Sequence, residues 1–417
     1  MSKRQTDVLI LGGGVIGLAC AHYLLQAGRS VRVLEQGRVG AATSLGNCGT
    51  ITPSHAPPLA APGVIAKALG WMLRPDAPLY VKPRIDLPLA AWLLRFAARC
   101  NAQDWHRAAT AKGALLHASR GLLETLVKEH QLDCEFQALG LRYVYRDEKT
   151  FERDCAGLAA LKQFGIQSQL LGANALTTEE PALLPGMAGA IHFPGDAHFR
   201  PDRFTSELAR LVRAQGGVID EHVAVTGLEI ERGRVRSVAT VGGECSGRDV
   251  LVALGPWSAP MLQQVGLRLP VQPGKGYSIT YSRPALAPVI PLVLKEHSVC
   301  VTSWASGFRL GSTMEFSGYD RALNRVRLDA LERAAALYLR EPVGTEKQQE
   351  WYGWRPMTFD DLPILGAAPG FDNLWLATGH GMMGMGLSAI TGQLLAELIT
   401  GAETSVDPAP SSPLRFA

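Results

Sequence analysis

Three glycines near the start of the chain have the spacing of a nucleotide-binding turn. Gly12, Gly14 and Gly17 stand in G-x-G-x-x-G order between an apolar run at residues 8–11 and a helical stretch. In such a unit the first glycine permits a tight turn, the second lets the backbone approach a diphosphate, and the third lets the helix pack on the strand. The free N–H groups at the start of the helix also attract an anion. The pattern predicts a dinucleotide site.

An acidic residue completes this unit and narrows the choice of dinucleotide. Glu35 ends a second apolar strand, residues 31–34, at about the 20-residue spacing expected for an acid that hydrogen-bonds a ribose hydroxyl. A carboxylate there repels a 2′-phosphate, so we expect FAD or NAD(H) rather than NADP(H). A lone glycine motif also occurs in structural loops. Here the two strands, the helix and the acid are all present, which favours the nucleotide interpretation.

The cysteines argue against a metal centre or a disulfide framework. The chain has seven cysteines, an odd number, and no C-x-x-C pair. We therefore expect no metal ligands, and a reducing compartment fits best.

The N-terminal apolar stretch is interrupted by glycines and does not resemble a signal peptide. No apolar window is long enough to span a bilayer. These observations predict a cytoplasmic protein.

Length and composition indicate a large globular protein. With 417 residues, the chain is expected to form two or three folding units. Hydrophobic residues make up 47% and charged residues 19%, which is enough to build a substantial core. The net charge is only +3, and Lys and Arg are scattered. Without a basic stripe, nucleic acid is excluded as a partner.

The residues above must be positioned by a long loop, several helices and several β segments along the chain. A loop rich in Gly, Ser, Thr and Pro covers residues 38–64, and long ordered loops are usually functional. The helices that we predict cover residues 64–73, 88–100, 105–130, 201–214 and about 322–340. The predicted β segments cover residues 141–147, 190–199, 218–225, 235–254 and several stretches between 270 and 320, before a final strand, glycine turn and helix at 373–401.

We interpret this order as a nucleotide-binding domain with a second domain inserted into it. The expected fold is α/β, with a Rossmann-like domain and an inserted α+β domain built on a mainly antiparallel sheet. The predicted nucleotide-binding domain is discontinuous and comprises residues 1–58, 200–270 and 355–417. The substrate-binding domain comprises residues 59–199 and 271–354.

Five motifs along the chain resemble those of one family. They are GGGVIG, TSLGNCGTITPSHAPPLAAPGVIAKALGWML, PGKGYSIT, GWRPMTFDDLPILG and NLWLATGHGMMGMGLSAITGQLLAEL. In this order and spacing they resemble FAD-dependent enzymes of the D-amino-acid oxidase superfamily, and most of all bacterial D-amino acid dehydrogenases. The resemblance extends from Val8 to about Gly401. It implies an FAD-dependent enzyme.

The resemblance also implies which residues hold FAD. The diphosphate is assigned to the glycine turn, the adenosine to the end of the second strand, and the flavin to the following loop and to the C-terminal glycine turn. The matching positions are Gly12, Gly14, Val15, Ile16, Gly17, Glu35, Gln36, Thr43, Ser44, Asn47, Gly49, Thr50, Val223, Gly255, Trp257, Gly379, His380, Gly381, Met382, Met383 and Gly384.

The substrate residues implied by the resemblance are fewer. Arg355 matches the arginine that holds the substrate carboxylate, whereas without the resemblance a surface or interdomain salt bridge is the favoured interpretation of this residue. Tyr277 is either a second substrate contact or a packed strand tyrosine, and His55 either shapes the substrate entrance or belongs to the loop. Cys48 is interpreted as an ordinary thiol, with a thioether to flavin as the alternative. No catalytic side chain is expected, because flavin N5 accepts the hydride.

The resemblance implies oxidative deamination of D-amino or D-imino acids, with electrons passed to a quinone or another non-oxygen acceptor. This chain departs from the usual family sequence in two places, with Gly381-Met382-Met383-Gly384 in the C-terminal turn and His55 in the loop. These departures affect the expected substrate side chain, so the candidate substrates include cyclic ones such as D-proline or D-hydroxyproline. The alternatives are a glycine, sarcosine or D-amino acid oxidase that produces hydrogen peroxide, and a partner-dependent FAD-binding subunit.

A peripheral contact with the inner membrane is a further expectation, because the electron acceptor could be a membrane quinone. The helical segments at residues 71–74 and 92–99 combine Trp, Leu and Arg, which suits a membrane surface where a quinone takes electrons. Ordinary core packing is the alternative that we favour for these tryptophans.

Overall fold

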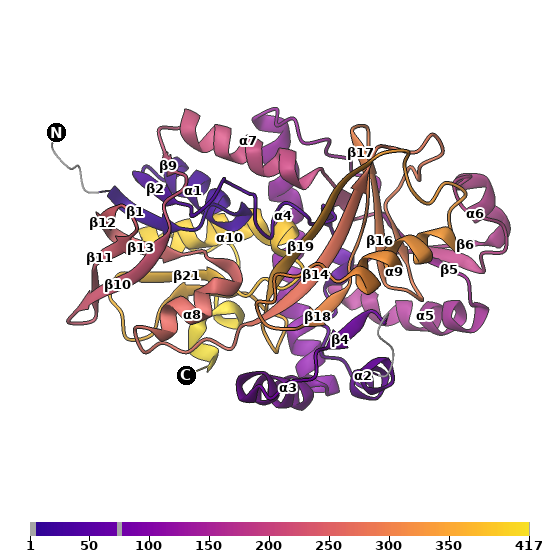
Figure 1. Ribbon diagram of the computed structural model, residues 1–417, viewed down its shortest axis with the longest axis horizontal. Coiled ribbons are helices and arrows are strands. Elements are labelled where there is room, and N and C mark those ends of the chain that lie inside the picture. Colours follow the sequence, from indigo (N-terminus) through magenta and orange to yellow (C-terminus); the bar gives the residue numbers. More distant parts are fainter. Residues whose placement is uncertain (1–5, 73–76, 417) are drawn as a thin grey trace.

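Two large sheets lie side by side in the molecule, as Figure 1 shows. The computed structural model describes residues 6–72 and 77–416. The first sheet is parallel except for its edge strand β20. Its strands, in spatial order, are β20 (Ile364–Ala367), β21 (Leu374–Thr378), β13 (Gly247–Val252), β1 (Thr6–Leu11), β2 (Val31–Leu34) and β9 (Val218–Asp220).

Both faces of this first sheet are covered, which explains the uninterrupted apolar run in β1. Val8 and Ile10 pack toward α1 (Val15–Gln26), α7 (Pro201–Ala214) and α10 (Gly384–Thr400). Leu9 and Leu11 pack on the opposite face toward α8 (Ser258–Gln263) and a small sheet. That sheet consists of β10 (Val225–Glu231), β11 (Arg234–Thr240) and β12 (Gly243–Cys245).

The second sheet is larger and mainly antiparallel. Its strands, in spatial order, are β4 (Leu79–Val81), β18 (Met314–Phe316), β14 (Gln272–Tyr281), β17 (Gly307–Gly311), β16 (Val299–Trp304), β15 (Leu292–Leu294), β5 (Leu141–Tyr145), β7 (Gly189–Phe193) and β6 (Gln169–Gly172), with β19 (Lys347–Met357) paired to β14. Only the pairs β4–β18 and β5–β15 are parallel among its described strands. The predicted fold class is confirmed.

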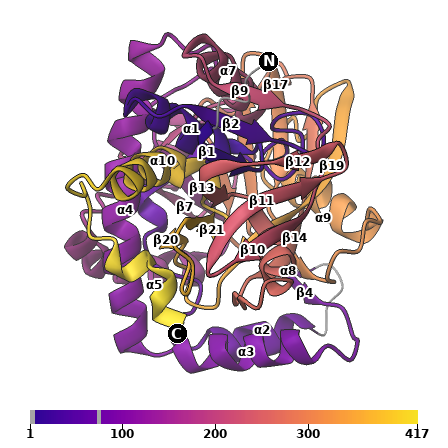
Figure 2. The same ribbon diagram turned by 90° about the vertical axis from the view of Figure 1, so that its left-hand side faces the viewer.

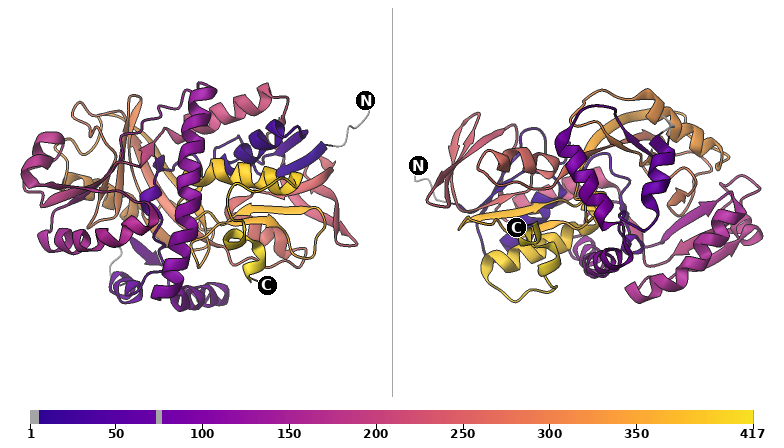
Figure 3. Two further views of the ribbon diagram at one scale, coloured as in Figure 1. Left: turned by 180° about the vertical axis from the view of Figure 1, so that it is seen from behind. Right: turned by 90° about the horizontal axis from the view of Figure 1, so that it is seen from below.

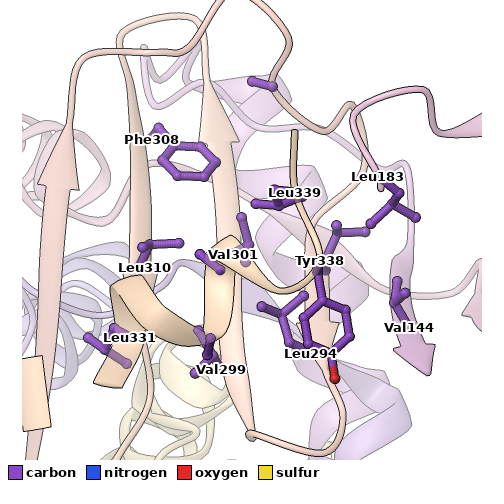
Figure 4. Packing of buried hydrophobic residues seen from close by; sticks show 14 of the residues in the cluster. Val144, Leu183, Leu294, Val299, Val301, Phe308, Leu310, Leu331, Tyr338 and Leu339 are labelled. Atoms are coloured by element: carbon purple, nitrogen blue, oxygen red, sulfur yellow. The ribbon is translucent and has the colours of Figure 1, made fainter. Parts of the chain in front are cut away.

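A helix covers this sheet and closes its core. Leu331 of α9 (Arg325–Ala336) lies near Leu310 and Val299 from the middle strands in Figure 4, and Phe308 and Val301 belong to the same buried cluster. Tyr338 follows the helix and fills the same layer. At the far edge of the sheet lie α5 (Glu148–Leu161) and α6 (Ala173–Glu179).

One long helix joins the two halves. Helix α4 (Ala102–Glu129) runs between them in the rear view of Figure 3. Its residues Leu123 and Leu126 pack with Val15 of α1 and Met385 of α10. The prediction placed this segment with the inserted domain, but it packs on both halves, since its Leu115 and Leu116 lie in a cluster with Tyr145 and Phe193 of the second sheet and with Leu387 of α10. The domain division therefore remains a proposal, and its boundary at 354/355 falls within β19.

Most predicted elements have counterparts, with differences that have local causes. Helix α7 has the predicted bounds 201–214. The predicted strand 190–199 is interrupted by a turn, so that β7 is followed by β8 (Ala197–His198), which pairs with β3 (Thr50–Ile51). The predicted strand 218–225 ends at Asp220, where the chain turns toward β10.

Helices α2 (Val64–Met72) and α3 (Leu87–Arg99) lie together at one end of the molecule, as Figure 2 shows. Leu73 and Arg74, the end of the segment predicted to combine Trp, Leu and Arg, lie outside the described residues. Trp92 of α3 is buried against Phe316, as the packing alternative predicted. Among the described helices, none has the length and apolarity that crossing a bilayer requires.

Candidate active site

A cavity of about 940 Å³ lies where the two sheets meet. Its wall includes the β1–α1 turn, the loop after β2, the C-terminal glycine turn and Arg355. Residues that are far apart in sequence are therefore brought to one continuous space. This volume is at the upper end of the range for ligand pockets in proteins.

The geometry of the β1–α1 turn depends on its glycines. Gly12 has a φ of +108°, and a Cβ there would lie 2.5 Å from the carbonyl oxygen of Ala253. A Cβ at Gly17 would lie 2.0 Å from the carbonyl oxygen of Gly12, so only glycine lets α1 pack this closely on β1. Gly14 is the N-cap of α1 and lies in the cavity wall. The contacts of Gly12 and Gly17 are those expected of a tight turn and of close packing between helix and strand.

Glu35 lies at the carboxyl end of β2, beside the same turn. Its two carboxylate oxygens accept hydrogen bonds from the backbone N–H groups of Gly13, at 2.8 Å, and Gly37, at 2.9 Å. Glu35 also lines the cavity, together with Gln36 and Val223. The carboxylate is thus fixed where the resemblance assigns the adenosine ribose.

The loop after β2 forms the next part of the wall. Ser44 Oγ accepts a hydrogen bond from the N–H of Val15 at 3.1 Å, which ties this loop to the start of α1. Most of the predicted FAD residues reach the cavity, and these are Gly12, Gly14, Val15, Ile16, Glu35, Gln36, Thr43, Ser44, Asn47, Thr50, Val223, Gly255, Trp257, His380, Gly381, Met382, Met383 and Gly384.

Three predicted FAD residues, Gly17, Gly49 and Gly379, lie behind the wall. Gly49 has a φ of +74°, and a Cβ there would lie 2.0 Å from the carbonyl oxygen of Phe199. Gly379 has a φ of +75°, at the turn between β21 and α10. These glycines shape the turns that carry the neighbouring wall residues.

The C-terminal glycine turn directs a second helix start toward the cavity. Residues Gly381 to Gly384 lie in the wall, and α10 begins at Gly384. His380 Nε2 lies 3.0 Å from Thr391 Oγ1, and burial lowers the pKa of His380 to about 3. The imidazole is therefore neutral at physiological pH. Because α10 presents its N-terminal end, this turn favours negative charge in the cavity.

Arg355 provides the cation of the site. It lies on β19, and its Nη1 donates a hydrogen bond of 2.7 Å to the carbonyl oxygen of Thr313. A Cβ at Gly276 of β14 would lie 2.4 Å from the guanidinium, so this glycine makes room for the arginine. Burial lowers the pKa of Arg355 to about 10, which leaves it charged at neutral pH.

Arg355 has no acidic partner among the residues that the structure describes. A buried charge without a counter-ion is costly, and such groups are normally paired. The salt-bridge interpretation of Arg355 is therefore not supported. A cation in this state is suited to bind an anion that enters the cavity.

His55 also lies in the cavity wall, on a short 3-10 helix, Pro53–His55. Its Nε2 lies 2.7 Å from the hydroxyl of Tyr143, a residue that sequence reasoning missed. Burial and the nearby Lys112 and Lys295 lower the pKa of His55 to about 3, so the ring is neutral. Tyr143 and Lys295 belong to the second sheet region and carry no motif, and only their packing identifies them as wall residues.

Tyr277 does not reach this cavity. Its ring is buried in the core of the second sheet, and its hydroxyl donates a hydrogen bond of 3.0 Å to Glu315 Oε2. In β14 its neighbours Gly276 and Ser278 point to the opposite face of the sheet. The prediction of Tyr277 as a substrate contact is therefore corrected, and the packed-tyrosine alternative describes it.

We expect the Tyr277→Phe variant to keep its KM and kcat while losing stability. Removing the hydroxyl takes a donor from a buried carboxylate, which costs about 1–3 kcal/mol of unfolding free energy. Urea titration and steady-state kinetics measure the two effects. Tyr143→Phe is the matched comparison, since its hydroxyl contacts His55 in the wall and its loss should change KM. A changed KM in Tyr277→Phe would restore this residue to the site.

A buried acid supports the segment that carries His55. Asp196 accepts hydrogen bonds from the N–H and hydroxyl of Ser54, at 3.0 and 2.5 Å. Burial nevertheless raises the pKa of Asp196 to about 7 from its ordinary value of 3.8. The folded protein therefore holds this proton over a range in which the unfolded chain has released it.

This difference predicts that stability falls as the pH rises. Between pH 4 and 7 the native state binds the Asp196 proton and the unfolded state does not, so each pH unit removes unfolding free energy. From pH 5.5 to 8 the expected loss from this group is about 2 kcal/mol. Asp196→Asn should abolish this part of the slope in urea titrations, whereas Asp133→Asn, whose side chain is 79% exposed, should retain it. Equal slopes in both variants would contradict the prediction.

Together, the fold and the cavity define a dinucleotide-dependent oxidoreductase. The helix after the first strand of the parallel sheet begins at a glycine turn, and the cavity lined by this turn is also lined by the Arg355 guanidinium. Comparison with known proteins gives the class more closely. Residues 7–398 match the model of the DAO family, described as FAD dependent oxidoreductase.

Full-length relatives and solved structures agree with this match. The chain is 34% identical to the D-amino acid dehydrogenase of Xanthobacter autotrophicus, over 98% of this chain and 99% of that protein. It is 33% identical to that of Chromohalobacter salexigens, over 99% and 100%. Glycine oxidase from Geobacillus kaustophilus has a similar fold, with a TM-score of 0.78, 24% identity and 98% of each chain covered. For L-proline dehydrogenase from P. horikoshii the TM-score is 0.74, at 18% identity over 99% and 98%.

The chain therefore belongs to the DAO family of FAD-dependent oxidoreductases. The predicted resemblance, enzyme class and FAD cofactor are confirmed. The residues present also fit this cofactor, because two helix N-termini and a glycine cradle line one cavity that is large enough for a dinucleotide. The β1–α1 turn would hold the diphosphate, Glu35 the ribose, and the loop around Ser44 together with the C-terminal turn the flavin.

Proposed function

We propose that this chain oxidises D-amino or D-imino acids to the corresponding imino acids and passes the electrons to an acceptor other than oxygen. The observation that carries the proposal is Arg355, a guanidinium without an acidic partner among the described residues, in the wall of the cavity that the glycine turn also lines. The carboxylate of an amino acid substrate would be the counter-ion of this guanidinium. The relatives named D-amino acid dehydrogenase support the choice of substrate class.

The chain's own residues contribute mainly binding and orientation. Arg355 binds the substrate carboxylate with two parallel N–H donors, and this fixes the direction of the α-carbon. The Thr313 carbonyl holds the guanidinium in place through its 2.7 Å hydrogen bond. Met314 and Met357 add apolar wall beside it, which excludes water from the reacting carbon. When bound, FAD supplies the hydride acceptor for the α-hydrogen.

The neutral His55 and Tyr143 shape the side-chain end of the proposed site. Neither residue carries a charge at neutral pH, because burial lowers the pKa of His55 and raises that of Tyr143. The nearby Lys295 ammonium is paired with Asp154 at 3.0 Å. With that charge paired, this part of the wall suits an uncharged side chain or a ring such as that of D-proline or D-hydroxyproline. The imino acid product hydrolyses with water to a keto acid and ammonium, or persists when it is cyclic.

The second part of the proposal concerns the electron acceptor, which we assign to a quinone at an anionic lipid surface. Helix α3 contributes Trp92 and Phe96 to the cavity wall. Its outer surface exposes Leu87 by 77% and Leu94 by 73%, and Ile85 just before it is fully exposed. Arg95 and Arg99 are exposed on the same helix. Exposed leucines beside arginines suit shallow insertion among anionic headgroups.

Anaerobic reduction of the bound flavin tests the proposed chemistry. Purified holoenzyme is mixed with both enantiomers of a panel of amino acids, including proline and hydroxyproline, and flavin bleaching is recorded. We expect bleaching by D-enantiomers only. Bleaching by L-enantiomers would overturn the substrate assignment, and no bleaching by any amine would favour a partner-dependent subunit. Oxygen uptake with stoichiometric peroxide would favour an oxidase.

Vesicle binding and quinone reduction test the acceptor. The chain should co-sediment with vesicles containing anionic phospholipid, and a Leu87→Ser/Leu94→Ser variant should lose this binding while reducing a soluble quinone normally. Equal binding of both proteins would remove α3 from the proposal.

A further inference from the structure

Two cysteines, Cys48 and Cys300, meet in the cavity wall. Cys300 of β16 lies directly opposite Gly311 of β17 in the antiparallel register. Side chains of such paired residues project from the same face, with Cβ atoms about 5 Å apart. Gly311 has no side chain, and the Cys48 Sγ lies 2.6 Å from the place that its Cβ would occupy. The Cys48 thiol thus takes the position of a cross-strand neighbour of Cys300.

The loop that carries Cys48 is held in this position. Arg309 of β17 donates hydrogen bonds from Nη1 to the carbonyl oxygens of Leu45, at 2.9 Å, and Asn47, at 2.6 Å. Asn47 Oδ1 in turn accepts the N–H of Gly49 at 2.7 Å. On the other side of Cys48, the Gly49 carbonyl oxygen accepts a hydrogen bond of 3.0 Å from the N–H of Phe199. The loop is therefore fastened on both sides of Cys48. The two thiols are kept together by the fold.

The charges around the pair give its two members different roles. Hydrogen bonding with Cys300 and the nearby Arg309 and Arg355 lower the pKa of the Cys48 thiol. The same pairing and burial raise the pKa of Cys300. Cys48 is therefore the better nucleophile, whereas Cys300 stays a protonated thiol during the first attack. Both residues line the cavity, so a small molecule reaches them.

We propose that Cys48 and Cys300 are a modification site, a redox-active thiol pair that a hydroperoxide converts into a disulfide inside the substrate cavity. The Cys48 thiolate attacks the terminal oxygen of the hydroperoxide, and the O–O bond breaks to release hydroxide or alkoxide. The resulting sulfenic acid is attacked by Cys300, which forms the S–S bond and releases water. The two thiols lose two electrons in total, and the hydroperoxide is reduced by two.

The disulfide would affect the site beside it. It would join the loop that contains Ser44 and Asn47 to the second sheet, close to Arg355. The cavity wall beside Arg355 would then carry a disulfide in place of two thiols, which changes its shape and polarity where the substrate carboxylate is proposed to bind. Oxidation is therefore expected to stop turnover until a dithiol restores the pair. This inference does not depend on which amino acid is the substrate, because the test below identifies the bond itself.

Peptide mapping tests the proposal on the holoenzyme. The protein is treated with hydrogen peroxide, alkylated, unfolded, digested without reductant and analysed by mass spectrometry. We expect a linked Cys48–Cys300 peptide and the loss of two of the seven thiols. Activity should fall in proportion to the linked peptide and return with dithiothreitol. Flavin should stay bound and be released in full on unfolding, whereas a flavin attached to the Cys48 peptide would overturn the proposal.

Three variants separate this pair from incidental oxidation. In Cys300→Ser, dimedone should trap a sulfenic acid at Cys48, and in Cys48→Ser, Cys300 should remain reduced. Cys245→Ser, on β12 outside the cavity, is the matched control and should form the linked peptide like the parent protein. If either pair variant loses its flavin, arsenical labelling of the parent protein decides, because a monosubstituted arsenical bridges only adjacent thiols. Peroxide oxidation that maps to other cysteines, or no bridging, would contradict the proposal.

Discussion

Replacing Arg355 with alanine is expected to lower kcat/KM for the amino acid substrate by about 10³-fold while leaving FAD bound. Each hydrogen bond to a charged group contributes about 1.5–3 kcal/mol, and a guanidinium makes two of them to one carboxylate. Their loss removes orientation as well as affinity, so both KM and kcat should suffer. The FAD residues lie mainly on other turns of the wall, and the cofactor should remain.

Steady-state kinetics and the flavin spectrum of the same preparation measure this prediction. Arg355→Lys should recover little, because an ammonium cannot provide two parallel donors. The matched control is Arg325→Ala, which removes an exposed arginine paired with Glu350 at 2.6 Å. Unchanged kinetics in Arg355→Ala would exclude Arg355 from the site. Equal losses in both variants would indicate a general effect of removing an arginine.

Replacing Gly14 with valine is expected to weaken FAD binding by about 100-fold without unfolding the protein. Gly14 has an extended backbone, with φ of −77° and ψ of 177°, that any residue adopts. A Cβ there would meet only Ser44 Oγ at 3.5 Å, an ordinary contact. The added Cβ therefore fits the protein itself, and because Gly14 lines the cavity, we expect the methyl groups of valine to occupy space assigned to the diphosphate. Overfilling such a space typically costs 1–3 kcal/mol, and 2.7 kcal/mol corresponds to about 100-fold.

Titration of the FAD-free protein with FAD, followed by quenching of flavin fluorescence, gives the affinity. Thermal unfolding without FAD should give nearly the same midpoint for the variant and the parent. Gly121→Ala in α4 is the control, since a Cβ there meets nothing within 4 Å and alanine favours a helix. If Gly14→Val binds FAD normally, the diphosphate lies elsewhere.

The parts of the site that could be predicted are those encoded by local spacing. The turn from Gly12 to Gly17 and the acid Glu35 form one short unit, in which backbone geometry and chemistry are set by neighbouring residues. The match of α7 to its predicted bounds has the same origin, because Pro201 and Asp202 mark its start. The C-terminal turn before α10 was predicted for similar reasons.

The remaining features depend on contacts between distant segments. Tyr277 and Arg355 lie on neighbouring strands and both suit a carboxylate, yet only the register and the pleat decide which one faces the cavity. The pairing of His55 with Tyr143 joins residues 88 positions apart. The contact between Cys48 and Cys300 likewise requires a glycine on a third segment. No local spacing of residues in the sequence predicts these contacts.

The position of α4 limits how this enzyme can be rebuilt. A designer who exchanges the substrate half for that of another flavoenzyme would cut at the predicted boundaries and remove α4 with it. The apolar sides of α1 and α10 would then face water, since Leu123 and Leu126 cover them. A functional chimera must therefore keep residues 102–129 from the recipient, or supply a helix with the same leucine pattern.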